Sequence, residues 1–530
     1  MKLMGTNNSF QHKGTKIQSS NLKTSVPLYL CVSLNVLFGV AVVLFFALAY
    51  PHHLHYQEQF QLFLFDSTYV WDIVREPGGV ADLLGRFCTQ FFLYAWVGAL
   101  IIGLLLSTVQ LLTLRLVSLS SGGTGPQPLY GLSFVPSFLL WLFLLDENAL
   151  LGGVWAVLLS MLAAWAIISL AKGLPYRKKL FTFHISLLIL FAILALYFLA
   201  GPVCLPLPID SLWTGIHYHR YPTVFPWLLW AAALSVWVLV GIALLIRCFP
   251  KNFSLHSPLT TLLLTALVAV TMGTLVWKNA NLRAEKVMQY DFMARHQQWN
   301  RILETANREK PNNQIGVTVQ NLALAMRGVL LDQLFNYHQN GIAGLLPDVK
   351  EDATSPLPTA EAFYQLGMIN VAQRTVFEAQ EAILDFQKSG RCYKRLAQTN
   401  LINGQYEVAR KYLTALQKTL FYRDWANETL QLLGDEAAIA RHPEYGRLRR
   451  MAYVEDLTFG RASSRSATSS ELDGSRLTGD FYFSDHTTPE MLECLYRTNT
   501  ANGLAYQYLL AYYMLTGDRE GFEKAIKIKR

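Results

Sequence analysis

Two carboxylates, Glu58 and Asp66, are the side chains whose type and position best suit chemistry, because both lie in a polar stretch between two strongly apolar segments. A carboxylate at a membrane surface can take a proton from a hydroxyl nucleophile or bind a divalent cation. On one continuous helix, eight residues of separation would turn the two acids about 80° apart and place them about 12 Å apart along the axis. We therefore expect separate roles for them. The competing interpretation is that both acids keep an interfacial helix solvated.

A second set of candidates consists of polar and basic side chains in the connections between apolar segments. A guanidinium can hold a phosphate through two parallel hydrogen bonds, and imidazoles can assist it. We predict phosphate or substrate binding by six residues, namely Arg75, Arg86, Asp210, His217, His219 and Arg220. The alternative is ordinary contact with lipid headgroups.

Three histidines, His52, His53 and His55, precede Glu58. A His-x-His pair binds metal on a strand-like backbone with further ligands nearby, and imidazoles at headgroup level also serve as polar anchors. We assign no metal ligands here. The cofactor stays open, with a divalent cation at the acids as the candidate. The chain has no phosphate-binding glycine motif, no nucleophile elbow and no CxxC framework. A disulfide between Cys392 and Cys494 is a further option.

Seven apolar segments are long enough to cross a bilayer, which takes about 20 residues each. They cover residues 27–50, 88–114, 128–146, 149–171, 180–200, 224–247 and 258–277. Pro136 interrupts the third segment, and Asp146 to Asn148 join it to the fourth as a tight hairpin. The chain is 52% hydrophobic, and its apolar residues crowd into these segments. This composition predicts a polytopic membrane protein.

Basic residues predict the orientation of the spans, because they collect in cytoplasmic loops. The tail 1–25, Arg115, the cluster 172–179 and the pair Arg247 and Lys251 fall on one side. We expect a cytoplasmic N-terminus, a transmembrane domain over 26–280 with an outward loop at 51–87, and a periplasmic domain over 281–530 of a bacterial inner-membrane protein. The net charge of +8 is explained by this topology and by solvated helices, so we expect no nucleic-acid partner.

The outward loop reads as a helix running to Arg75. Phe60, Phe63, Leu64, Trp71 and Val74 fall near helical spacing. We expect a juxtamembrane helix lying on the bilayer.

The tail has the pattern of paired helices and resembles tetratricopeptide (TPR) repeats. In the clearest unit, aromatic and small side chains fall at the positions of the 34-residue helix–turn–helix repeat, namely Tyr393, Leu396, Ala397, Gly404, Tyr406, Ala409 and Leu413. Segment 460–488 reads as a long loop. The expected fold class is therefore all-α, a helix bundle of about seven spans followed by a TPR-like α-solenoid.

This layout resembles the GT-C class of membrane glycosyltransferases, some of which append a TPR array. The resemblance implies an essential acid and juxtamembrane helices in the first outward loop. It implies transfer of a sugar from a polyprenyl-linked lipid donor to a protein or glycan acceptor held by the tail. Glu58 or Asp66 would act as base or hold a metal, and Arg75, Arg86 or Arg220 would stabilise the departing phosphate. The usual acidic doublet of that loop is absent.

A second resemblance rests on the stretch 56–63, on Pro77-Gly78-Gly79 and on the stretch 87–92. These are similar to an uncharacterised family of bacterial inner-membrane proteins with TPR-like tails. That similarity implies no activity. The alternative function is a non-enzymatic, membrane-anchored TPR scaffold that organises an envelope protein complex.

Overall fold

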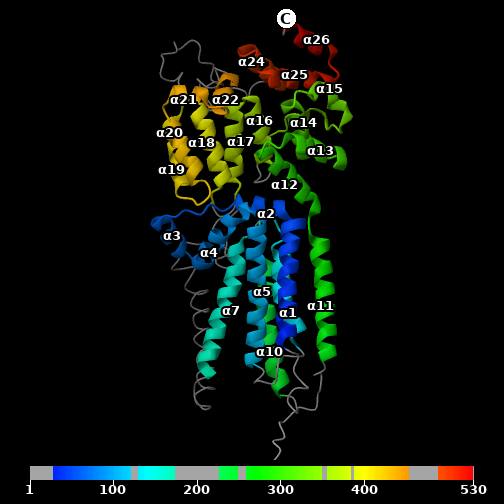
Figure 1. Cartoon of the computed structure of the whole chain (residues 1–530), viewed down its shortest axis with the longest axis vertical. Helices are drawn as coiled ribbons and strands as arrows, with labels where there is room; N and C mark the ends of the chain where they lie inside the picture. Colours follow the sequence, from blue (N-terminus) through cyan, green and yellow to red (C-terminus); the bar gives the residue numbers. More distant parts are fainter. Residues whose placement is uncertain are drawn as a thin grey trace, which may run out of the picture.

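The computed structural model describes residues 28–120, 129–172, 226–248, 258–348, 355–383, 387–452 and 487–528. Within these ranges every regular element is a helix. Figure 1 shows long helices side by side at one end of the molecule and short, paired helices stacked at the other. The all-α prediction is confirmed for the described residues.

Five helices are long and apolar enough to cross a membrane, with mean hydropathy between 2.1 and 2.6 over the described residues. They are α1 (Leu28–Leu44, extended by the π-helical turn Phe45–Ala49), α5 (Ala95–Ser120), α7 (Leu151–Lys172), α10 (Trp227–Cys248) and α11 (Pro258–Asn279). Their exposed side chains are apolar along most of their length, as a lipid-facing surface requires.

Two of the seven predicted spans do not appear among these five. The third is a shorter apolar stretch made of a 3-10 turn, Gly131–Phe134, and α6, Val135–Phe143. Pro136 lies in the first turn of α6, where proline is tolerated because that N–H has no helical partner. The fifth, 180–200, lies outside the described residues. The structure therefore supports a multi-pass membrane protein with five candidate spans.

A polar contact inside the bundle joins α1, α5 and the 3-10 turn. Asn35 donates to the side-chain oxygen of Gln110 at 2.7 Å, and Gln110 donates to Ser133 at 2.8 Å. All three side chains are buried. Polar side chains between membrane helices find partners across the interface in this way, so this chain of hydrogen bonds fixes how the helices are rotated against one another.

The first loop, residues 50–94 between α1 and α5, contains α2 (Pro51–Glu58), α3 (Ser67–Val74), α4 (Gly79–Thr89) and the 3-10 turn Gln90–Leu93. The prediction of one helix running to Arg75 is wrong. α2 ends at Glu58, and residues 61–66 carry no regular structure before α3 begins. The reason is tertiary, because this segment bonds to the C-terminal helices, as described below.

α4 is held close to the start of α7 by a contact between two glycines. A Cβ added to Gly85 would lie 2.4 Å from the backbone nitrogen of Gly152 and 2.6 Å from its Cα. Any side chain larger than hydrogen at Gly85 would therefore push the two helix backbones apart. This close approach positions the first loop on the bundle.

The C-terminal helical region, residues 282–528, begins directly after α11. Its helices pack in antiparallel pairs over large apolar clusters. They are α12 (Leu282–Arg295), α13 (Trp299–Glu309), α14 (Gln314–Met326), α15 (Leu330–Gln333), α16 (Pro356–Leu366), α17 (Ile369–Glu381), α18 (Gly390–Ile402), α19 (Tyr406–Gln417), α20 (Arg423–Leu432), α21 (Glu436–Arg441), α22 (Tyr445–Met451), α24 (Thr488–Thr498), α25 (Gly503–Thr516) and α26 (Arg519–Ile528), with 3-10 turns at Leu334–Asn336 and Gly341–Gly344.

The repeat unit predicted around Tyr393 coincides with the α18–α19 pair. Leu396 and Ala397 of α18 and Ala409 and Leu413 of α19 are buried in the packing between helices. Most of the long loop predicted at 460–488 lies outside the described residues. Cys392 is buried and forms no disulfide, so the optional bond between Cys392 and Cys494 is not made.

Substitution of Gly85 by Ala should lower the apparent melting temperature of the detergent-solubilised protein, since overpacking costs about 1–3 kcal/mol. Gly273→Ala on α11 is the matched control, because no atom lies within 4 Å of its added Cβ. We expect Gly273→Ala to melt at or above the wild-type temperature. Equal melting of the two variants would contradict the close packing of α4 on α7.

Candidate functional site at the junction of the first loop and the helical region

The first turn of α2 is capped by a carboxylate from another helix. Glu285 of α12 accepts the backbone N–H of His52 at 2.7 Å and that of His53 at 2.8 Å. The first N–H groups of a helix have no partner within it, so this buried carboxylate satisfies two of them and faces the positive end of the helix dipole. Burial raises the pKa of Glu285 to about 7. The contact joins the exit of the first span to the first helix after the last described span.

The three histidines of α2 pack as buried rings. Nε2 of His53 lies 3.0 Å from the carbonyl oxygen of Leu144. The rings of His52 and His55 lie against Phe292, with centroids 5.1 Å and 4.4 Å away. Burial lowers the pKa of each histidine to about 4, so all three are neutral at pH 7. Among the described residues, no group of three or more His, Cys, Asp or Glu side chains is placed to hold a metal ion.

Glu58, predicted as a catalytic acid, ends α2 and points into the helical region. Its Oε1 accepts the hydroxyl of Tyr422 at 2.9 Å, and its Oε2 lies 4.0 Å from a guanidinium nitrogen of Arg295. Burial raises the pKa of Glu58, and Arg295 and Tyr422 offset part of that effect. This carboxylate is therefore engaged between the first loop and the helices α12 and α20.

The segment after α2, residues 61–66, has no regular secondary structure and lies against the helical region. Its backbone donates from Leu62 to the carbonyl of Lys388 at 2.8 Å and from Phe65 to the carbonyl of Lys418 at 2.7 Å. Leu62 packs in a cluster with Leu413, Leu416 and Tyr422 of the helical region. The acceptors of these bonds lie in the loops between the C-terminal helices. Because the backbone N–H groups of Leu62 and Phe65 are bonded there, they are not available for hydrogen bonds within a helix.

Asp66, the other predicted acid, closes this segment. It caps α3 by accepting the N–H of Thr68 at 2.9 Å, and it pairs with Lys418 in the loop between α19 and α20. The hydrogen bond from Lys418 and those from Thr68 hold the pKa of Asp66 well below its usual range. Asp66 is therefore a helix cap and a surface ion pair, and it does not approach Glu58 as a pair.

Arg391, on α18, was not predicted and is the most fully bonded charge of the junction. Its guanidinium donates to both carboxylate oxygens of Asp291 at 2.6 and 2.8 Å and to the side chain of Gln59 at 3.1 Å. A bidentate pair of this kind fixes orientation as well as distance. Arg391 therefore binds α12 and the first loop at once.

Two further basic residues of α18 lie beside it. Arg395 pairs with Glu361 of α16 and stacks 3.6 Å over the ring of Tyr364. Lys394 lies 4.8 Å over the ring of Trp425, and burial, with the neighbouring cations Arg295 and Arg395, lowers its pKa to about 8. A sequence signal for these residues exists. α18 carries three basic side chains within five positions and no acid of its own, so their partners must come from other elements.

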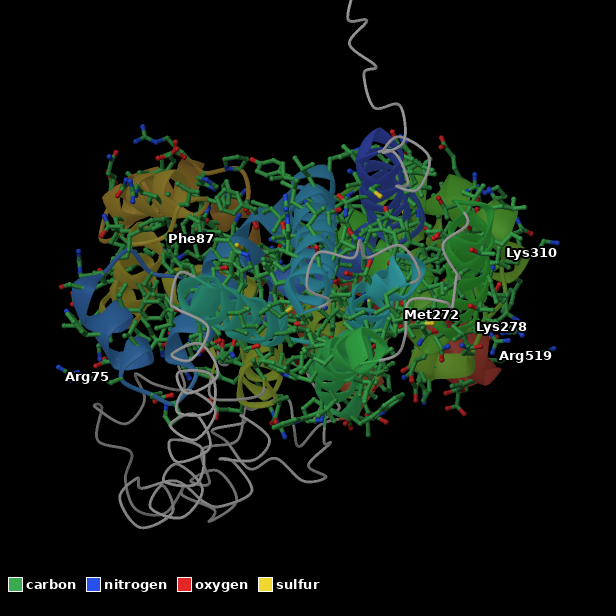
Figure 2. The ribbon with its side chains drawn as sticks, turned by 90° about the horizontal axis from the view of Figure 1, so that it is seen from below. Arg75, Phe87, Met272, Lys278, Lys310 and Arg519 are labelled. Carbon is green, nitrogen blue, oxygen red and sulfur yellow. The ribbon has the colours of Figure 1, made fainter. Side chains whose placement is uncertain are left out.

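The remaining predicted residues do not join this cluster. Arg86 pairs with Asp82 one turn earlier on α4, at 2.7 Å. Arg75 is exposed at the end of α3, and Figure 2 shows it at the outer edge of the molecule. Asp210, His217, His219 and Arg220 lie outside the described residues.

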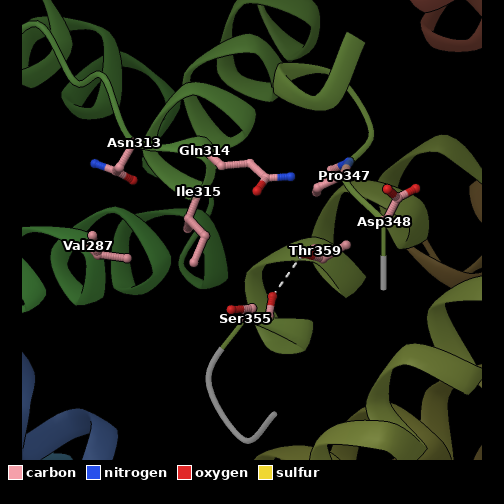
Figure 3. Close-up of a pocket in the computed structure, with 8 residues that line it drawn as sticks. All are labelled: Val287, Asn313, Gln314, Ile315, Pro347, Asp348, Ser355 and Thr359. Atoms are coloured by element: carbon pink, nitrogen blue, oxygen red, sulfur yellow. Dashed lines mark hydrogen bonds between the residues drawn. The ribbon is translucent and has the colours of Figure 1, made fainter. Parts of the chain in front are cut away.

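A pocket of about 160 Å³ lies away from this junction, within the helical region. Figure 3 shows it between the start of α14, where Asn313 and Gln314 lie, and the start of α16, where Ser355 and Thr359 lie. Asn313 caps α14 by accepting the N–H of Gly316 at 2.7 Å, and Thr359 donates to the carbonyl of Ser355 at 2.8 Å.

Residues 27–530 match the family described as a family of unknown function (DUF6057), and the chain belongs to that family. No curated protein and no solved structure matches the chain. The expected membership of an uncharacterised membrane-protein family is confirmed in this form, and the family description carries no activity.

Arg391→Met should destabilise the protein strongly, because it leaves Asp291 buried without a partner, at a cost of about 3–5 kcal/mol. The double variant Asp291→Asn/Arg391→Met should regain part of this loss. Arg374→Met is the matched control, since Arg374 and Glu378 form a half-exposed pair at 3.9 Å, and ion pairs in contact with water are worth about 0–1 kcal/mol. Thermal unfolding in detergent measures all three. Equal loss from Arg391→Met and Arg374→Met would contradict a buried clamp.

The histidines and Glu285 predict opposite pH dependences. His55 binds a proton more readily when unfolded, so it makes stability fall as the pH drops from 6.5 to about 4, by at most about 1.4 kcal/mol per pH unit. Glu285 binds a proton more readily when folded, so it makes stability fall as the pH rises from 4.5 to about 7.

Unfolding should be followed against pH for two variants. His55→Phe keeps the stack on Phe292 and should reduce the loss of stability as the pH falls from 6.5 to about 4. Glu285→Gln should reduce the loss of stability as the pH rises from 4.5 to about 7. A His55→Phe curve parallel to wild type from pH 4 to 6.5 would show that the ring is not buried in solution.

Proposed function

We propose that this protein is a non-enzymatic, membrane-anchored scaffold whose C-terminal helical region offers a binding surface for a partner protein. The strongest support for this proposal is that both candidate acids are already bonded to side chains of the helical region. Glu58 is bonded to Tyr422 and lies beside Arg295, and Asp66 is bonded to Lys418. A general base must lie within hydrogen-bond reach of its substrate, whereas these carboxylates hold the first loop against the helical region.

The helix spacing supports a TPR-like array. α16 begins at Pro356 and α18 at Gly390, an offset of 34 residues, and each is followed by an antiparallel partner. Gly367 and Gly404 form the turns within these two pairs with left-handed φ angles of 88° and 73°. Stacks of such pairs present extended surfaces that bind peptides or folded partners. In this proposal the first loop fixes the array at the outward face of a bacterial inner membrane.

A second function, sugar transfer by a GT-C-like enzyme, is favoured by one specific observation. The three short helices α2, α3 and α4 of the first loop lie at the ends of the spans (Figure 1), where that class carries its juxtamembrane helices. In this alternative a polyprenyl-linked donor would meet Glu58 or Asp66 and a basic side chain such as Arg86.

The variant Asp66→Asn distinguishes the two functions. It removes a candidate catalytic acid that lies at the edge of the junction, so it should disturb the docking of the helical region less than a change at Glu58. The scaffold proposal expects partner capture by the purified full-length chain to survive this change. It also expects the wild-type protein to transfer no sugar in vesicles that contain a polyprenyl-linked donor and a peptide acceptor. Transfer by wild type that Asp66→Asn abolishes, with thermal unfolding unchanged, would overturn the scaffold in favour of the enzyme.

The partner surface can be tested on the exposed apolar side chains of the array. Phe377 on α17 and Val408 on α19 are each 39% exposed, and Ile526 on α26 is 38% exposed. We expect Phe377→Asp or Val408→Asp to weaken capture of a stoichiometric partner at least tenfold, about 1.4 kcal/mol, and Ile526→Asp to leave it unchanged. Capture that is insensitive to all three would remove the central pairs as the binding surface.

A further inference from the structure

The loop between α19 and α20, residues 418–422, reaches the end of a membrane span. The centroid of the Phe421 ring lies 5.7 Å from that of Phe91 and 5.5 Å from that of Tyr94, and both contacts are edge-to-face. α5, a candidate span, begins at the next residue, Ala95. A loop of the helical region, more than 300 positions away in sequence, is therefore at the level where α5 leaves the bilayer.

The side chains around this contact are apolar and exposed. Leu420, next to Phe421, is 42% exposed, and Trp96, in the first turn of α5, is 56% exposed. Three large exposed side chains of the first loop are joined to this contact through ring–ring contacts, namely Phe65, Phe87 and Tyr94. Trp71 is 59% exposed on α3. Figure 1 shows α3 and α4 beside the ends of α5 and α7, beneath α19.

Ring contacts make this surface continuous. Phe63 contacts Phe65 and Phe87, with centroids 5.0 and 5.4 Å apart, and Phe87 contacts Phe91 at 5.6 Å. Phe91 in turn contacts Phe421. This row of aromatic rings ends next to the first turn of α5. We therefore expect the lipid that surrounds α5 to reach the loop 418–422 as well.

We infer that the loop 418–422 is a membrane-docking element, with Leu420 inserted into the headgroup region of the bilayer at the level of α3, which carries Trp71, and of the first turn of α5, which carries Trp96. Tyr and Trp gather at this level because one end of the ring is apolar and the other is polar. Arg75 and Arg423, both exposed, lie at the ends of α3 and α20 and match lipid phosphate. We favour lipid over a partner protein because the apolar surface continues onto a candidate membrane span, and a protein-binding surface has no need of that continuity. The helical region is thus bound to the bilayer along one edge as well as through α11 and α12.

The test uses the full-length chain with the photo-crosslinking residue p-benzoyl-phenylalanine at position 420, reconstituted in vesicles of phosphatidylcholine and phosphatidylglycerol. The matched control is position 335. Phe335 is 63% exposed in the helical region and follows α15, which Figure 1 shows at the far side of that region from the spans. Irradiation should give a lipid adduct at 420 and none at 335, as read by mass spectrometry. Adducts in equal yield at both positions, or adducts to protein alone at 420, would overturn the inference.

A second measurement does not depend on crosslinking. Single cysteines at 420 and 335, in a chain whose six native cysteines are replaced by serine or alanine, carry the fluorophore NBD. Lipids with a nitroxide on the headgroup should quench the label at 420 at least severalfold more than the label at 335. Equal quenching would place the loop in water and contradict membrane docking. Thermal unfolding of each labelled chain shows whether it is folded like the wild type.

Discussion

One buried carboxylate sets the position of the helical region. Glu285 accepts two N–H groups at the start of α2, and it lies in the first turn of α12, just after the end of α11. The exit of the first span and the exit of α11 are therefore bonded to each other and not merely connected through the bundle. Tyr50 adds a second bond at the same place, because its hydroxyl accepts the N–H of Asn281 at 3.0 Å. With these contacts, the direction of α2 is defined, and Glu58 and Gln59 at its far end are carried to α20 and α18.

The contacts beyond α2 then fix the register of the chain. Backbone bonds from Leu62 and Phe65 reach Lys388, just before α18, and Lys418, just after α19, so sliding this segment by one residue would break both. The buried charges work in the same direction. Replacing a buried ion pair by apolar side chains often costs little, but removing one partner is expensive. We therefore interpret Arg391 and Asp291 as a device that admits one docked arrangement and penalises the others.

Sequence reasoning succeeded where the signal is local. Apolar length locates the five spans, and the small and aromatic positions around Tyr393 locate the α18–α19 pair. It failed where the deciding partner is distant. Phe60, Phe63 and Leu64 stand at helical spacing but lie beyond the end of α2, where Phe60 and Leu64 pack against the C-terminal helices. The partner of Glu58 lies 364 residues later and that of Asp66 lies 352 residues later. No local pattern encodes either pairing.

The position of Glu58 also determines how its substitution has to be interpreted. This carboxylate links α2 to Tyr422 and Arg295, so removing it disturbs the junction whether or not it performs chemistry. Loss of activity at Glu58 alone would therefore fit a base and a structural bond equally well. Asp66 is different, because the side chain of its partner Lys418 is 45% exposed and because an Asn at position 66 can still accept the N–H of Thr68 and cap α3. A carboxylate that can be removed without loosening the fold distinguishes a catalytic role from a positional one, and in this junction Asp66 meets that condition better than Glu58.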